Sequence, residues 1–177
     1  VANIDPDRIA VMGFSLGGEI AVHLGSQIVH DRYVNPGQSG FAAYVAFYPG
    51  CWWLFDSQRN KDSGKICESV SIDCKFEGKP VGKPLFILAG ESDSWGDGTL
   101  CNDFVNVLNH YSPEMAKTKI YPDAHHAFDL PGVNQTWVEE NWLGPHKGPH
   151  KATVRHNKKA ANQSTRDAAD FLTEFLF

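Results

Sequence analysis

The fold expected of this chain is decided by one stretch near its start, Arg8-Ile9-Ala10-Val11-Met12-Gly13-Phe14-Ser15-Leu16-Gly17-Gly18. The apolar run as far as Met12 is typical of a buried strand. Beyond Gly18, apolar residues recur at the spacing of one helix face, at Ile20, Ala21, Leu24 and Ile28. Between these two segments lies a G-x-S-x-G pattern, which predicts a sharp turn from a strand into a helix.

Ser15 is the residue that this turn presents for chemistry. A serine hydroxyl is a weak nucleophile at neutral pH and needs a neighbouring base. The flanking glycines, Gly13 and Gly17, are expected to let the backbone pass where a Cβ would clash. The turn also places the Leu16 N–H at the start of the helix, where it can bind an oxyanion. A serine that only caps the helix is the alternative, but the strand before it and the helix after it favour a nucleophile.

The rest of the chain alternates strands with helices. Apolar runs predict further strands at 41–48, 84–89 and 118–121, and helical spacing predicts helices at 100–111 and 168–176. Such alternation predicts an α/β fold with a mostly parallel sheet and helices on both faces. In such sheets a site forms at the carboxyl ends of the strands. The residues just after each strand are therefore the candidates for function.

Composition and two long stretches limit the other possibilities. Residues 54–83 are polar and are expected to cross the surface, and residues 131–157, rich in Pro, Gly, His and Trp, are expected to be irregular. The 177 residues, 42% hydrophobic and 21% charged, suit one globular domain. A net charge of −5 gives a nucleic-acid partner no electrostatic support. No run approaches the roughly 18 apolar residues of a membrane span, so no membrane partner is expected.

An acidic residue follows the strand at 84–89. Asp93 stands three residues beyond Gly90, where a carboxylate can orient an imidazole and stabilise it once it is protonated. Glu91 and Asp97 compete for this role. Any one of these acids can also be a solvated turn residue, so the residues alone favour Asp93 without excluding the others.

Two adjacent histidines, His125 and His126, follow the strand at 118–121. Histidine is the natural general base because its pKa lies near neutrality, but only one of the two can point at Ser15. Neighbouring side chains rarely bind one ion, so a metal site is not expected here. A looser group at His146, His150 and His156 lies among basic residues and favours a solvated loop over a metal site. We expect no metal and no organic cofactor.

Four cysteines leave the redox state open. They are Cys51, Cys67, Cys74 and Cys101, and none of their spacings is a CxxC pair. Cys67 and Cys74 lie in one polar stretch and can close a small ring, which leaves Cys51 and Cys101 for each other. Four reduced, buried thiols are the alternative. Pairing would indicate a periplasmic or secreted location, and free thiols a cytoplasmic one.

Three segments together resemble the dienelactone hydrolase family of α/β-hydrolases. They are Gly13-Phe14-Ser15-Leu16-Gly17-Gly18, Gly90-Glu91-Ser92-Asp93, and Tyr121-Pro122-Asp123-Ala124-His125-His126-Ala127-Phe128. The resemblance implies the α/β-hydrolase fold. It also maps the family's acid onto Asp93 and its base onto His126, with His125 as a neighbour that shapes the loop.

Two features depart from the family pattern. Its name-giving members use a cysteine where this chain has Ser15, which points to ester hydrolysis of a broader kind. The resemblance also implies several strands before the turn that carries Ser15, and the loop after one of them carries a second oxyanion donor. We therefore expect residues 1–177 to be a single catalytic domain that is the C-terminal part of a longer one. A preceding segment or a second chain is then expected to complete the sheet at its open edge.

These observations predict a serine hydrolase that cleaves a small carboxylic ester or lactone through an acyl-enzyme. Trp52, Trp53 and Trp95 lie near strand ends and are expected to line the substrate pocket, although core packing would explain them equally well. A peptidase or an acyltransferase of the same fold is an alternative that a triad does not exclude. A binding module that keeps the fold without catalysis is another.

Overall fold

A four-stranded parallel sheet forms the centre of the structure, a computed structural model that describes residues 4–54, 79–96, 98–140 and 149–177 except for the side chain of Trp53. The strands lie in the order β1 (Ala10–Phe14), β2 (Ala43–Phe47), β3 (Leu85–Gly90) and β4 (Ala116–Tyr121). Every neighbouring pair is parallel. The strands predicted from the apolar runs are confirmed, and so is the prediction of an α/β fold with a parallel sheet.

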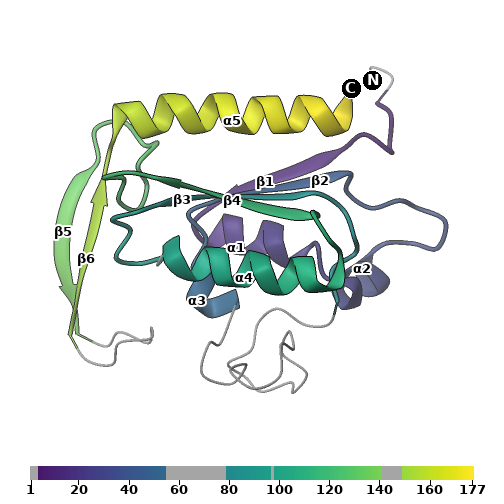
Figure 1. Ribbon diagram of the computed structural model, residues 1–177, viewed down its shortest axis with the longest axis horizontal. Coiled ribbons are helices and arrows are strands. Elements are labelled where there is room, and N and C mark those ends of the chain that lie inside the picture. The colour runs from purple at the N-terminus through teal and green to yellow at the C-terminus, as the bar shows by residue number, and fades with distance from the viewer. Residues whose placement is uncertain (1–3, 55–78, 97, 141–148) are drawn as a thin grey trace.

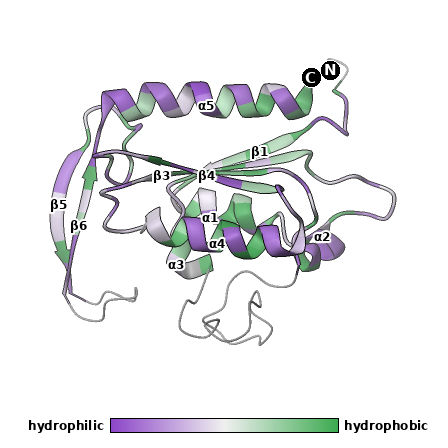
Figure 2. Ribbon diagram, in the orientation of Figure 1, coloured by the Kyte–Doolittle hydropathy of each residue, from purple (hydrophilic) through white to green (hydrophobic). Residues whose placement is uncertain are grey.

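Helices cover both faces of this sheet, but unequally (Figure 1). One face carries α1 (Leu16–His23), α2 (Gln27–Tyr33), α3 (Cys51–Leu54) and α4 (Gly98–Tyr111). The other face carries α5 (Lys158–Leu176), the one described helix that crosses the sheet there. Hydrophobic and hydrophilic residues alternate along α5 (Figure 2), as expected of a helix with one buried face.

The core lies on both faces of the two central strands. All residues of β2 and β3 are buried, because each strand is covered from both sides and therefore needs apolar residues throughout. Along β3, Ile87 points into the cluster that includes Leu108 of α4, whereas Phe86 joins the cluster that includes Phe171 of α5. The alternation of β3 side chains thus holds the two helix layers on one sheet.

An antiparallel hairpin stands beside the carboxyl ends of the strands. It consists of β5 (Asn134–Glu139) and β6 (His150–Arg155), paired from Asn134↔Arg155 to Glu139↔His150. The expectation that residues 131–157 are irregular is therefore wrong for these strands. Gly, Pro and His residues interrupt this part of the sequence, so its short β-prone runs do not stand out as strands. In addition, β6 pairs with a residue far away in the sequence, through the bridge between Val154 and His126.

Two expectations concern residues at the margins of this description. The predicted surface excursion at 54–83 falls mainly on residues 55–78, which lie outside the described part of the structure. Within the described ranges, no helix combines the length and the apolar character that crossing a membrane requires.

Candidate active site

Ser15 occupies the strained turn between β1 and α1. Its backbone has φ 53° and ψ −121°, a conformation that non-glycine residues rarely adopt. Such strain costs on the order of 1–3 kcal/mol and persists only where the surroundings enforce it. Here the Ser15 N–H donates to the Phe47 carbonyl of β2 at 3.0 Å. The turn also makes Leu16 the first residue of α1, so its N–H lies at the helix N-terminus.

Two glycines make this turn sterically feasible. A Cβ on Gly13 would lie 1.9 Å from the Gly17 oxygen, and a Cβ on Gly18 would lie 2.9 Å from the Phe47 oxygen. A Cβ on Gly17 would meet nothing within 4 Å. The expectation of a tight passage thus holds for Gly13 but not for Gly17, and the second close approach belongs to Gly18.

Asp93 lies at the turn after β3 and is almost completely buried. Its Oδ1 accepts hydrogen bonds from the backbone N–H groups of Trp95 at 2.8 Å and Gly96 at 2.7 Å. Its Oδ2 lies 2.9 Å from His126 Nδ1. The competing Glu91 instead accepts from the Asp123 N–H on the exposed side of the turn. Asp97, the other competitor, lies outside the described residues.

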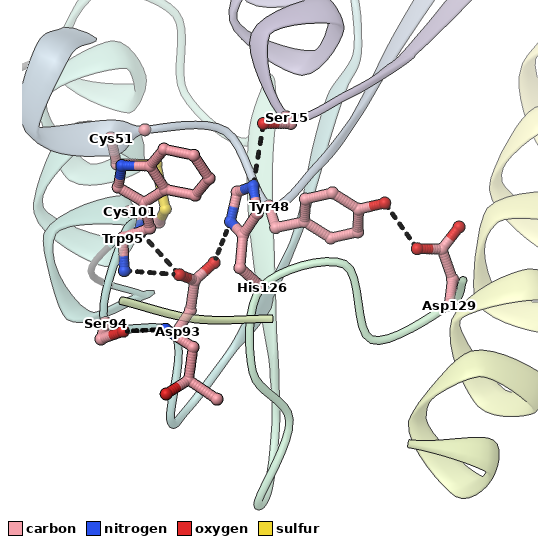
Figure 3. A network of polar contacts seen from close by, with 12 residues as sticks. Ser15, Tyr48, Cys51, Asp93, Ser94, Trp95, Cys101, His126 and Asp129 are labelled. Carbon is pink, nitrogen blue, oxygen red and sulfur yellow. Dashed lines mark hydrogen bonds and ion pairs between the residues drawn. A yellow bond between two sulfur atoms is a disulfide. The ribbon is translucent and has the colours of Figure 1, made fainter. Parts of the chain in front are cut away.

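His126 joins Asp93 to Ser15 (Figure 3). Its Nε2 lies 2.8 Å from Ser15 Oγ. A carboxylate only accepts hydrogen bonds, so Nδ1 carries the proton and Nε2 faces the serine hydroxyl as an acceptor. The loop is held by the Arg155 N–H, which donates to the His126 carbonyl at 3.1 Å. His125 points elsewhere, with its Nε2 3.4 Å from Arg155 Nη1.

Aromatic side chains surround this chain of hydrogen bonds. The rings of Tyr48 and Trp95 lie 4.8 Å and 5.1 Å from the His126 ring. Trp52 donates from Nε1 to the Trp95 carbonyl at 2.8 Å, and the Trp137 ring of β5 meets the Trp95 ring at 5.5 Å. Trp53, expected to line the pocket, has its side chain outside the described part.

Tyr48 and Trp137 are absent from the sequence-based set of candidate residues. Tyr48 could have been found, because it directly follows β2, at the edge where the strands' carboxyl ends meet. Trp137 had no comparable signal, since its place depends on a hairpin that the sequence did not predict.

A disulfide lies next to the turn that carries Asp93, called the acid turn below. Cys51 of α3 and Cys101 of α4 are bonded, with their Cα atoms 5.1 Å apart. The Cys51 N–H also donates to the Gly96 carbonyl at 3.2 Å. Of the alternatives left open by the sequence, pairing holds for these two cysteines, whereas Cys67 and Cys74 lie outside the described residues.

The histidines suspected as a loose group do not form a metal site in the described ranges. His150 contacts the Ser94 carbonyl through Nε2, and His146 lies in a range that the structure does not describe. Among the described residues, no three His, Cys, Asp or Glu side chains are arranged to hold a metal ion.

Comparisons with known proteins agree with this architecture. The family model of the dienelactone hydrolase family matches residues 1–176. No curated protein sequence matches the chain significantly. Solved structures that resemble it include a propionate-bound esterase from Thermogutta terrifontis (TM-score 0.58, 16% identity) and a dienelactone hydrolase-like promiscuous phosphotriesterase from metagenomic libraries (TM-score 0.55, 13% identity). Each alignment covers 97% of this chain but only 57% and 54% of those chains, respectively, so the chain spans little more than half their length.

Proposed function

The chain belongs to the dienelactone hydrolase family, and on that premise we propose that it hydrolyses carboxylic esters or lactones with Ser15 as nucleophile. The observation that carries the proposal is the unbroken hydrogen-bond chain from Ser15 Oγ through His126 to Asp93. Nucleophile, orienting acid and base (Ser15, Asp93 and His126) follow one another along the sequence in the order that α/β-hydrolases use. Each lies at the carboxyl end of a strand, where such sheets bind ligands.

The reaction proceeds in two acyl-transfer steps. His126 Nε2 takes the Ser15 hydroxyl proton while Oγ attacks the substrate carbonyl carbon. Asp93 holds the imidazole in the required tautomer and stabilises the imidazolium. The tetrahedral intermediate collapses, and the proton passes from Nε2 to the leaving alkoxide. Water then attacks the acyl-enzyme with His126 as its base, which releases the acid and restores Ser15.

The developing oxyanion needs at least two donors. The Leu16 N–H supplies one from the N-terminus of α1. In this proposal the other comes from a preceding segment or a second chain that adjoins β1. Loss of one such donor costs about 10²–10³-fold in rate, so the activity of the chain depends on that neighbour.

The aromatic surroundings support a small substrate. The Trp95 ring packs against His126, and the Trp52 indole N–H donates to the Trp95 carbonyl. With Trp53 as a further candidate, these side chains favour a small acyl or alcohol group that is apolar or aromatic. The Thermogutta esterase, which shares the fold, carries bound propionate, a small carboxylate.

A fluorophosphonate probe tests the assignment directly, because it labels only an activated serine. We expect labelling at Ser15, mapped by peptide mass spectrometry, and turnover of small esters. Both are expected to disappear in Ser15→Ala and His126→Ala. Ester turnover that survives in folded Ser15→Ala would end the assignment. Parallel assays with amide and thioester analogues of one acyl group separate an esterase from a peptidase or an acyltransferase.

A further inference from the structure

The His126 imidazole is held between two aromatic rings (Figure 3). The Tyr48 ring lies on one side at 4.8 Å with an interplanar angle of 63°, and the Trp95 ring lies on the other at 5.1 Å and 60°. Both contacts are edge-to-face arrangements, which aromatic pairs prefer. Rotation of the imidazole away from Ser15 would require one of these rings to move.

The Tyr48 ring is itself anchored at its far end. Its hydroxyl points away from Ser15 and donates to Asp129 Oδ1. Burial, and then the hydrogen bond to Asp129, raise the pKa of the Tyr48 phenol above its usual value, so the proton that makes this bond stays in place. Asp129 follows His126 by three residues. The bond therefore ties the end of β2 to the loop that carries the base.

Both loops joined by this bond have unfavourable backbone conformations. Tyr48 has φ 37° and Ala127, next to His126, has φ 55°, although neither is a glycine. Such conformations persist only where tertiary contacts enforce them. Tyr48 donates from its backbone N–H to the Leu88 carbonyl at 2.7 Å. The Tyr48 side chain holds the two loops against each other through its hydroxyl bond to Asp129 and through ring contacts with His126 and Phe128.

From this geometry we propose that Tyr48 and Asp129 are positioning residues that hold His126 Nε2 within hydrogen-bonding distance of Ser15 Oγ. The proposal rests on the function proposed above. Proton transfer requires heavy atoms about 2.6–3.2 Å apart, and a misplacement of about 1 Å can cost about a hundredfold in rate. Neither residue exchanges a proton with the substrate. Their contribution is the position of the base.

Tyr48→Phe tests the proposal because it keeps the ring and removes only the anchor. We expect kcat for a small ester to fall about tenfold with KM unchanged, together with a slower fluorophosphonate reaction. The downfield proton resonance of His126 Nδ1 is expected to broaden as the imidazole gains freedom. Tyr121→Phe is the matched control, since Tyr121 is also buried and donates to Asp167 at 2.7 Å, on the α5 side of β4. It should lower the melting temperature by a similar amount and leave kcat and the resonance unchanged.

Asp129 supplies a second pair of variants in case Tyr48→Phe folds poorly. Asp129→Asn keeps an oxygen that accepts the Tyr48 hydroxyl and should retain most of the activity. Asp129→Ala removes the acceptor and should match Tyr48→Phe. The double variant Tyr48→Phe/Asp129→Ala should be no slower than either single variant, because both remove the same contact.

Three results would overturn the proposal. One is an unchanged kcat in both Tyr48→Phe and Asp129→Ala. Another is an effect confined to KM, which would make Tyr48 a substrate contact. The third is additivity in the double variant. Failure of the proposed function is a different result, since the wild-type chain would then neither hydrolyse esters nor label at Ser15.

Discussion

The two ends of the hydrogen-bonded series Ser15–His126–Asp93 are buried to very different degrees. Asp93 and His126 are 5% and 6% exposed, and both accept backbone hydrogen bonds, Asp93 from Gly96 of its own turn and the His126 carbonyl from Arg155 of β6. At the other end, the residues that flank Ser15 face outward, with Phe14 41% and Leu16 67% exposed. The proposed acid and base, Asp93 with His126, are thus built into the interior and are called the acid–base end below. The proposed nucleophile, Ser15 with its two neighbours, lies at a surface and is called the nucleophile end.

The position of each strand in the sheet explains this difference. The acid–base end rests on β3 and β4, on the β5–β6 hairpin and on the disulfide, all within the described chain. The nucleophile end rests on β1, which is the outermost of the described strands on its side of the sheet. The difference teaches that the support of Asp93 and His126 comes from several described elements, whereas Ser15 rests on a strand with a described neighbour on one side only.

The largest expected effect comes from the acid–base end. In Asp93→Asn the new amide can still accept from the Trp95 and Gly96 N–H groups, so the turn should survive. Its NH₂ group would face His126 Nδ1 and favour the wrong tautomer, which lowers kcat on the order of 10⁴-fold. The measurement is ester turnover at saturating substrate.

Glu91→Gln is the matched control for Asp93→Asn. It makes the same change of charge two residues earlier in the same turn, where the side chain contacts only the exposed side. Activity should stay within twofold or so of the wild type, in line with ordinary surface changes. Equal losses in the two variants would mean that the turn's net charge, and not the contact to His126, governs the rate.

The next effect concerns the support of the acid–base end. The disulfide joins cysteines 50 positions apart, and closing a loop of that size stabilises a fold by about 4 kcal/mol in the chain-entropy account. The double variant Cys51→Ala/Cys101→Ala should lose about this much free energy of unfolding, measured by urea denaturation. An unchanged midpoint would show that packing of α3 against α4 suffices to hold the acid turn.

Much of the fold and three site residues could be predicted from the sequence. Strand periodicity placed Ser15, Asp93 and the histidine pair at the carboxyl ends of parallel strands, and such ends meet in space whatever joins them. The choice between His125 and His126 needed the family resemblance. The position of Tyr48 at a strand end could be read from the sequence, but its bond to Asp129 and the hairpin could not be predicted, because no sequence pattern indicates which segments pair. The same holds for Gly18, whose role depends on the approach of Phe47.

The two edges of the sheet extend the contrast and lead to the smallest expected effect. The edge strand β4 carries Lys117 and Lys119, which discourage pairing with other strands, whereas β1 exposes Met12 at 47% and Phe14 at 41%. This difference is visible in the colouring of the two strands in Figure 2. No described strand pairs with this edge of β1, and an exposed apolar edge favours association, so we propose that a further segment or a second chain covers β1.

Met12→Lys tests this last proposal. A charge at an exposed position should change the free energy of unfolding by no more than about 0.5 kcal/mol, yet it should make the edge resemble β4 and weaken self-association. Sedimentation velocity of the isolated chain should therefore show larger species for the wild type than for Met12→Lys. Val138→Lys is the control, because Val138 is 54% exposed on β5 and away from β1. If both lysines shift the distribution equally, general charge repulsion explains the result. If the wild type is already monomeric, the β1 edge does not drive self-association. The two ends of the site then differ only in their solvent exposure.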